Sequence, residues 1–131
     1  MKPMPSPMKV TVEKPGWISY VISGDLTEAR SSEIEEAIAR ADETIREQYH
    51  ETGQPVHILM DMNGFSHVYD LATLERFAQF AEKHGHDVAK TAGFGSSKQT
   101  RAAAAALLAF TDRDNIRFFE TKEEALAWLE S

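Results

Sequence analysis

The chain has 131 residues, of which 42% are apolar and 27% charged, and its formal net charge is −7 at neutral pH. This length and composition are typical of one soluble globular domain. The chain has no cysteine, which excludes disulfides, thiol catalysis and cysteine-bound metals and fits a cytoplasmic location. The acidic balance argues against a nucleic-acid partner, because phosphates require a concentrated basic surface.

Residues 1–8, MKPMPSPM, contain three prolines and no apolar segment. We expect a mobile N-terminal arm here, not a signal peptide or a membrane span. Residues 9–131 then form a single domain. Its most apolar later run, residues 102–110, is shorter than the roughly 20 residues that a membrane-spanning helix needs.

Residues 9–13 alternate between apolar and polar side chains, and Pro15-Gly16 is typical of a type II turn. Residues 17–23 continue as a second strand, so a hairpin opens the domain. Gly24 and Asp25 are expected to end that strand.

A long helix follows, because apolar residues recur at steps of three or four. Ser32 with Glu35 matches a capping box near its start, and Gly53 followed by Pro55 marks its end. Its inner face is predicted to hold Ile34, Ile38, Ala41, Ile45 and Tyr49.

Residues 56–62 are almost continuously apolar, which predicts a strand buried on both faces of a parallel sheet. A tight turn with polar side chains is expected next, and Asp70 is the predicted N-cap of a second helix. We call this turn the crest; its polar residues are Asn63, Ser66, His67, Tyr69 and Asp70. Because open α/β sheets bind ligands where strands lead into helices, the crest is a predicted ligand-binding site, with Ser66, His67, Tyr69 and Asp70 as its residues. The second helix should pack through Leu71, Leu74, Phe77, Ala78 and Ala81.

Residues 88–94 predict a short strand, and Gly95-Ser96-Ser97 opens a third helix in which Ser96 and Gln99 match a capping box. The alanines of residues 102–106 should let this helix approach its neighbour closely. Residues 115–119 are a last strand, and Thr121 with Glu124 caps a final helix. This order predicts an α/β fold, a mixed sheet of about five strands with about four helices.

The segments VHILMDMNGFS and IRFFETKEEALAWL, within the order described, resemble the SpoIIAA-like family of the STAS group. The resemblance implies a STAS-type fold and a non-enzymatic, regulatory module that binds a partner protein. In phospho-regulated STAS proteins an Asp-Ser-Ser-Gly motif carries the phosphorylated serine. Asp70 occupies that position here, which places a permanent negative charge there and leaves Ser66 as a nearby hydroxyl.

The family also resembles Sec14 (CRAL-TRIO) lipid-binding domains in architecture. That likeness implies an apolar ligand between helices and sheet, or reversible contact with a membrane surface. A homodimer is also left open.

A ligand with an anionic head is one interpretation of the third helix start, where Gly95, Ser96, Ser97, Lys98 and Arg101 lie together. Ordinary helix capping is the alternative. Likewise, Phe77 and Phe80 beside the alanines describe either an apolar slot or, as we expect, a tightly packed core with no cavity.

Other chemistry has weaker support in the sequence. His84 and His86 flank a glycine at a helix end and lack a third ligand, so we expect no metal and no cofactor. Ser66, His67, Tyr69 and Asp70 lie too close together in the chain to orient one another as a catalytic triad. An enzyme acting on a phosphorylated or acyl substrate near Ser66, Asp70 and Gly95 remains the alternative to a binding module.

Overall fold

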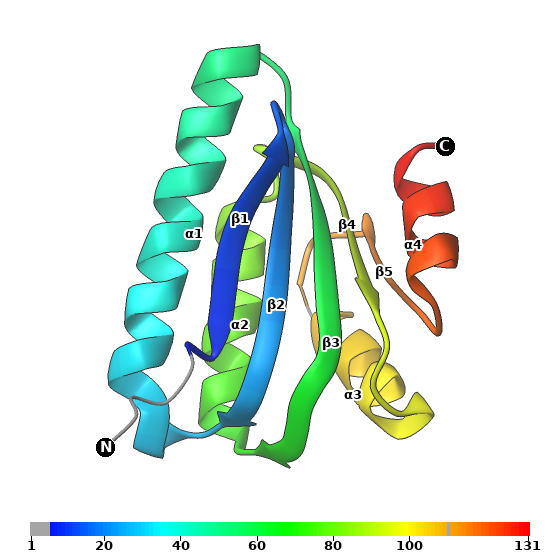
Figure 1. Cartoon of the computed structure of the whole chain (residues 1–131). Helices are drawn as coiled ribbons and strands as arrows, with labels where there is room; N and C mark the ends of the chain where they lie inside the picture. Colours follow the sequence, from blue (N-terminus) through cyan, green and yellow to red (C-terminus); the bar gives the residue numbers. More distant parts are fainter. Residues whose placement is uncertain (1–5, 110) are drawn as a thin grey trace.

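The computed structural model describes residues 6–109 and 111–131. A five-stranded sheet in the order β1-β2-β3-β4-β5 forms its centre, with β1 antiparallel to β2 and the remaining neighbours parallel. Four α-helices alternate with the strands after the hairpin (Figure 1). The predicted α/β fold is therefore confirmed.

The opening hairpin pairs β1 (Met8–Lys14) with β2 (Trp17–Leu26). Gly16 adopts a φ of +80°, as the predicted turn requires, and its N–H donates to Gln48 Oε1 at 2.8 Å. Met8 belongs to β1 and is buried, so it is not part of an arm of residues 1–8. Residues 1–5 of that expected arm lie outside the described residues.

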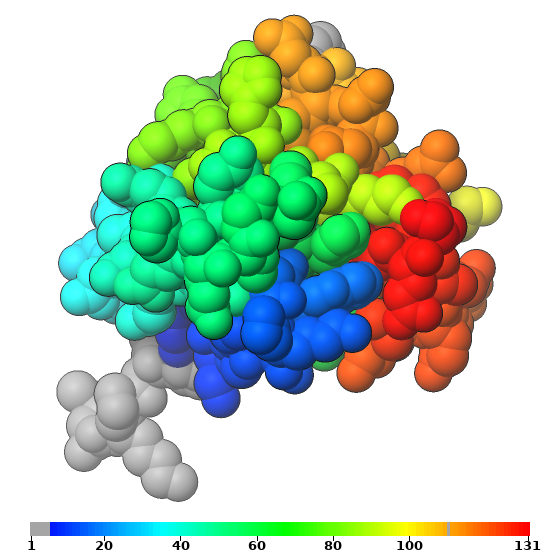
Figure 2. Space-filling model, turned by 90° about the horizontal axis from the view of Figure 1, so that it is seen from above, coloured from blue at the N-terminus to red at the C-terminus, as the bar shows by residue number. Residues whose placement is uncertain are grey.

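Helices cover the two faces of the sheet unequally. One face packs against α1 (Ser31–Thr52) and α2 (Leu71–Lys83), and α3 (Lys98–Leu108) lies on the same side. The other face packs against α4 (Lys122–Leu129) at β4 (Val88–Phe94) and β5 (Ile116–Phe119). Seen from above, the β1–β2 turn, the end of α1 and the end of α4 lie close together (Figure 2).

The strand after α1 is twice as long as predicted. Residues 56–62 do form an interior strand, but β3 continues through the crest to Tyr69 (Val56–Tyr69), so the expected tight turn is wrong. The cause is pairing with β2, which does not end at Gly24. Instead Gly24 pairs with Phe65, and Leu26 pairs with Tyr69. Two register shifts absorb the extra residues of β3.

Helix caps were predicted with mixed success. Thr121 and Glu124 form the expected capping box, and Gly53 ends α1 with a φ of +70°. The box predicted at Ser32 is wrong, because a short 3₁₀ turn, η1 (Glu28–Arg30), leads directly into α1 at Ser31. The box predicted at Ser96 is also wrong: Ser97 is the N-cap and accepts from Thr100 N–H.

Two apolar side chains were assigned to the wrong environment. Tyr49, at the far end of the α1 stripe, is 43% exposed, and Leu71, the first residue of α2, is 63% exposed. Leu71 follows directly from the exposed end of β3, so the buried stripe of α2 begins one turn later. The other residues predicted to face inward from α1 are buried.

Candidate functional site

An apolar cavity of about 420 Å³ lies between α2, α3 and the sheet. Its wall is made by side chains from both helices and from all five strands, including Met60, Met62, Leu74, Phe77, Leu107 and Phe118. Tight packing with no cavity, which we expected from the sequence, is therefore wrong. The apolar slot, the other interpretation of the same residues, is what the structure contains.

The floor of the cavity is a row of residues across the sheet. Tyr20, Met60, Gly93 and Phe118 pair in register from β2 to β5. A Cβ on Gly93 would lie 2.6 Å from the Phe118 ring, so the absence of a side chain at this position leaves room for the ring beside β4. The cavity lies between this row and α3, the helix above it.

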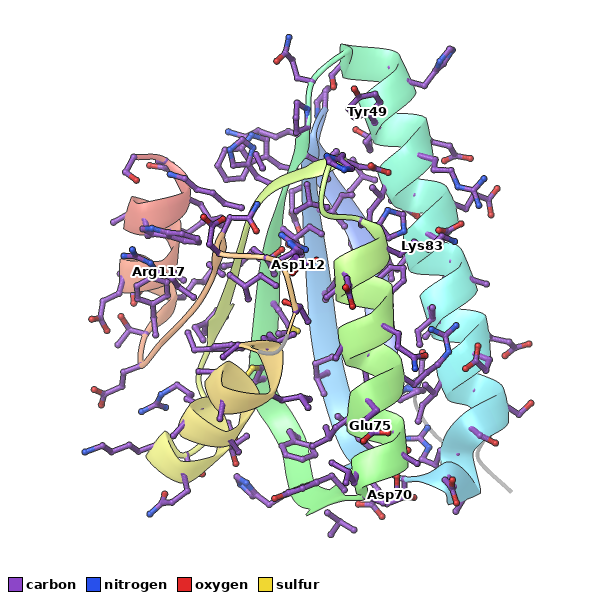
Figure 3. The ribbon with its side chains drawn as sticks, turned by 180° about the vertical axis from the view of Figure 1, so that it is seen from behind. Tyr49, Asp70, Glu75, Lys83, Asp112 and Arg117 are labelled. Carbon is purple, nitrogen blue, oxygen red and sulfur yellow. The ribbon has the colours of Figure 1, made fainter. Side chains whose placement is uncertain are left out.

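The alanines of α3 explain why the space stays open. Ala103 and Ala104 line the cavity with side chains of a single methyl group, and none of the described residues of α3 is buried. Seen from behind, α3 lies in front of the sheet beside α2 (Figure 3). The alanines thus let the α3 backbone approach β5 and α2, as predicted, while their short side chains leave the space beneath the helix unfilled.

The crest forms one polar end of the cavity. His67 Nδ1 lies 3.0 Å from Thr100 Oγ1, which joins the end of β3 to the first turn of α3. His67 has a φ of +71°, an unusual conformation for a side chain-bearing residue. Ser97 and Gln99 also line this end.

Among the remaining crest residues, Tyr69 also lines the cavity, and Ser66 and Asp70 stabilise the chain locally. Ser66 donates to Asp25 at 2.5 Å and accepts from Val68 N–H, while Tyr69 is half exposed. Asp70 caps α2 as predicted, accepting from Thr73 N–H at 2.9 Å, and it also accepts from Glu28 N–H at 2.7 Å. The Thr73 side chain lowers the pKa of Asp70 most, and the N–H groups of Glu28 and Thr73 lower it further.

At the start of α3, several polar groups already form hydrogen bonds within the chain. Arg101 donates to the carbonyl oxygens of Gly95 and Ser96 at 3.1 and 2.8 Å, and Lys98 is exposed. Gly95, at a φ of +84°, lies so close to Asn63 that a Cβ would meet the amide group. Ser96 Oγ is buried without a partner among the described residues. Anion binding at this position stays a prediction.

A second polar end of the cavity was missed by the sequence analysis. Tyr20, Thr91, His84 and Arg113 line the cavity at the end away from the crest. They come from β2, β4, the end of α2 and the connection after α3. No local sequence signal links them, because only the folded sheet brings these segments together.

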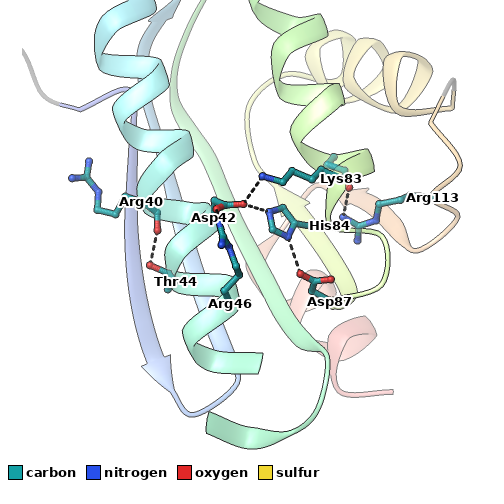
Figure 4. Close-up of polar contacts among 9 residues, drawn as sticks. Arg40, Asp42, Thr44, Arg46, Lys83, His84, Asp87 and Arg113 are labelled. Carbon is teal, nitrogen blue, oxygen red and sulfur yellow. Dashed lines mark hydrogen bonds and ion pairs between the residues drawn. The ribbon is translucent and has the colours of Figure 1, made fainter. Parts of the chain in front are cut away.

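His84 is held in a charged cluster beside this end (Figure 4). It is 3% exposed, with Nε2 2.8 Å from Asp42 Oδ1 and Nδ1 3.1 Å from Asp87 Oδ2. Burial alone would raise the pKa of Asp42, but hydrogen bonds from Arg46, Lys83 and His84 lower it to about 2. Through Asp42, His84 joins the end of α2 to α1.

Among the described residues no group of three or more His, Asp or Glu side chains is arranged to hold a metal ion. No helix in the described part of the chain is long and apolar enough to cross a membrane.

The hairpin, the parallel strands that follow it and the helices on both faces define the STAS-type class of α/β proteins. Within that class the chain belongs to the SpoIIAA-like family, whose sequence model matches residues 17–130. The resemblance found in the sequence is thereby confirmed. No curated protein matches the chain.

Solved structures of similar fold cover nearly the whole chain. An uncharacterised protein with a SpoIIAA-like fold from Shewanella loihica PV-4 has a TM-score of 0.68 at 20% identity, covering 98% of both chains. An anti-sigma factor antagonist from Mycobacterium paratuberculosis has a TM-score of 0.59 at 16% identity, also covering 98% of both. The anti-sigma factor antagonist SpoIIAA, in its unphosphorylated form, has a TM-score of 0.52 at 15% identity, covering 95% of this chain and 98% of its own.

Proposed function

We propose that this protein is a non-enzymatic binding module whose ligand is a small, largely apolar molecule held in the cavity between α2, α3 and the sheet. The cavity itself carries the proposal. Its volume of about 420 Å³ falls within the range of roughly 300–1,000 Å³ typical of small-molecule sites.

Ordinary packing does not account for such a space. Protein interiors are close-packed, and voids much larger than a water molecule are few. Here the void lies beneath a whole helix that has no buried residue, and aromatic and aliphatic side chains line it from both sides. An apolar occupant would restore the contacts that α3 does not make.

The crest supports a second candidate function, binding of a partner protein. Val68, Tyr69 and Leu71 are 51%, 51% and 63% exposed and follow one another closely at the end of β3. Two proteins of similar fold are named anti-sigma factor antagonists, which makes a partner protein a reasonable expectation for this chain. Asp70 at the position of the phosphorylated serine favours a partner that does not depend on phosphorylation there.

The geometry gives less support to the enzyme alternative. The hydroxyl of Ser66 contacts Asp25, and the imidazole of His67 contacts Thr100. No hydrogen bond between Ser66 and a histidine occurs in the described part of the chain, so a nucleophile and its base are not paired there. A cytoplasmic location, contact with a membrane surface and a homodimer remain predictions from the sequence.

Thermal unfolding with simple amphiphiles tests the cavity. We expect dodecanoate or dodecanol to raise the melting temperature, since a ligand at 100 times its Kd stabilises a fold by about 2.7 kcal/mol. Ala104→Phe should remove the shift by filling the cavity. Ala105→Phe is the matched control, because Ala105 is exposed and does not line the cavity.

Native mass spectrometry of protein purified without denaturant supplies the second measurement. A bound mass that the Ala104→Phe variant lacks would support the proposal. A clean unliganded mass, together with no thermal shift from either amphiphile, would refute it and leave the crest as the site to test.

A further inference from the structure

At the end of the cavity away from the crest, one buried hydroxyl group has no hydrogen-bond partner in the part of the chain that the structure describes. Tyr20 is 5% exposed, and its hydroxyl has no hydrogen-bond partner among the described residues. Burial raises the pKa of Tyr20, so the hydroxyl stays protonated and remains a donor. Buried polar groups are almost always paired in folded proteins, which makes an unpaired hydroxyl at a cavity wall a mark of a missing partner.

Arg113 supplies a cation at the same end. Its guanidinium donates to Asn115 Oδ1 at 2.9 Å, Thr91 Oγ1 at 3.3 Å and the Ala81 carbonyl at 3.4 Å. All three acceptors are uncharged, and a guanidinium has five N–H donors. In the described ranges no carboxylate lies within ion-pair distance of Arg113, and burial lowers the pKa of this group.

The nearby carboxylates do not serve as its counterion. Asp42 is held by Arg46, Lys83 and His84, and Asp87 by His84. Asp114, next in the chain, raises the pKa of Arg113 through its charge but forms no ion pair with it within the described residues. Arg113 and Tyr20 therefore offer donors to the cavity, with a positive charge that has no ion-pair partner in the described chain. A hydrogen-bond acceptor with negative charge is the group that satisfies both.

We propose that the cavity binds a single-chain carboxylate of the fatty-acid type, with its head group accepting from Tyr20 and Arg113. The apolar body lies along Met60, Phe77 and Phe118 toward the crest. This inference rests on the proposed function and names its ligand class. It places the head at the opposite end from the start of α3, where Arg101 is already bonded to backbone carbonyls.

The size of the cavity favours one chain over two. About 420 Å³ lies near the lower end of the range for small-molecule sites, which suits a single acyl chain better than a two-chain phospholipid. The uncharged match to the proposed ligand is the alcohol of the same chain length. The difference in binding affinity between the carboxylate and the alcohol isolates the contribution of the head group.

Isothermal titration of the full chain with dodecanoate and with dodecanol tests the assignment. We expect dodecanoate to bind at least about tenfold more tightly, as a charge-assisted hydrogen bond would give. Arg113→Gln should abolish that preference while leaving dodecanol binding within about twofold. Arg113→Lys should restore part of it.

Arg117→Gln is the matched control. Arg117 is exposed on β5 and lies over the Trp128 ring, 5.4 Å from its centre, on the α4 side of the sheet (Figure 3). The Arg117→Gln variant should keep the full preference for dodecanoate. Tyr20→Phe, which preserves the shape of the ring, should weaken dodecanoate more than dodecanol.

The outcomes separate this inference from the proposed function. Equal binding of the two amphiphiles to the unmodified chain would overturn the carboxylate head and leave an apolar ligand in place. Binding of neither would overturn both. If Arg113→Gln fails to fold, Tyr20→Phe decides, and an unchanged preference for dodecanoate in that variant would refute the assignment.

Discussion

The unpaired hydroxyl of Tyr20 destabilises the folded protein when no ligand is bound. An unpaired buried hydroxyl typically costs about 1–3 kcal/mol, and phenylalanine would fill the same volume without that cost. We therefore expect Tyr20→Phe to raise the free energy of unfolding of delipidated protein by about 1 kcal/mol in urea denaturation. Tyr69→Phe, at a half-exposed position, should leave it unchanged. A destabilised Tyr20→Phe would show that the hydroxyl has a partner after all.

Asp42 is the residue whose ionisation most affects stability at acid pH. Its pKa of about 2 lies below the ordinary value of about 3.9, so the folded chain binds a proton less readily than the unfolded chain. The stabilisation is complete above about pH 4 and is lost as the pH falls toward 2. Asp42→Asn should lower the free energy of unfolding by roughly 1–3 kcal/mol at pH 7.

The measurement is urea denaturation at pH 7 and across pH 2–4. In that acid range the variant should show a smaller change in stability with pH than the unmodified chain. Glu43→Gln, at the adjacent exposed position, is the control and should match the unmodified chain at pH 7 and throughout the acid range. Identical acid profiles for all three proteins would contradict the role assigned to Asp42.

Among the helices, α2 depends on one side chain at its start. Asp70 accepts from Thr73 N–H within the helix and from Glu28 N–H in the connection before α1. Asp70→Ala should therefore lower the melting temperature by several degrees, because it removes an N-cap and a link between two segments. Glu75→Ala, an exposed change in the same helix, is the comparison. Equal melting temperatures for these two variants would count against the capping role.

Local patterns predicted the elements that depend on local chemistry. Asp70 and Thr121 cap their helices as their sequence positions indicate, and residues 56–62 form the interior strand that their apolar run predicts. Ser96 was predicted to cap α3 because Ser96 and Gln99 match a capping box, but the N-cap is the next residue, Ser97. Ser96 has a left-handed conformation, with a φ of +62°, and Ser97 is therefore the N-cap.

On the scale of the whole molecule, the errors share a cause in contacts between distant segments. The length of β3 depends on its pairing with β2, and the cavity depends on how far α3 stands from the sheet. The alanines of α3 were equally compatible with close contact and with empty space. Tyr20 and Arg113, the polar end of the cavity, belong to segments that no sequence pattern connects.

The loose attachment of α3 has a kinetic consequence. The hydrophobic clusters of the described chain include no residue of this helix, so we expect α3 to open away from the sheet while those clusters stay intact. Exchange of a bound molecule then requires only a local opening, not passage through the unfolded state. A ligand of this protein would come and go many times within the lifetime of one folded molecule, and its residence time would be set by its own contacts.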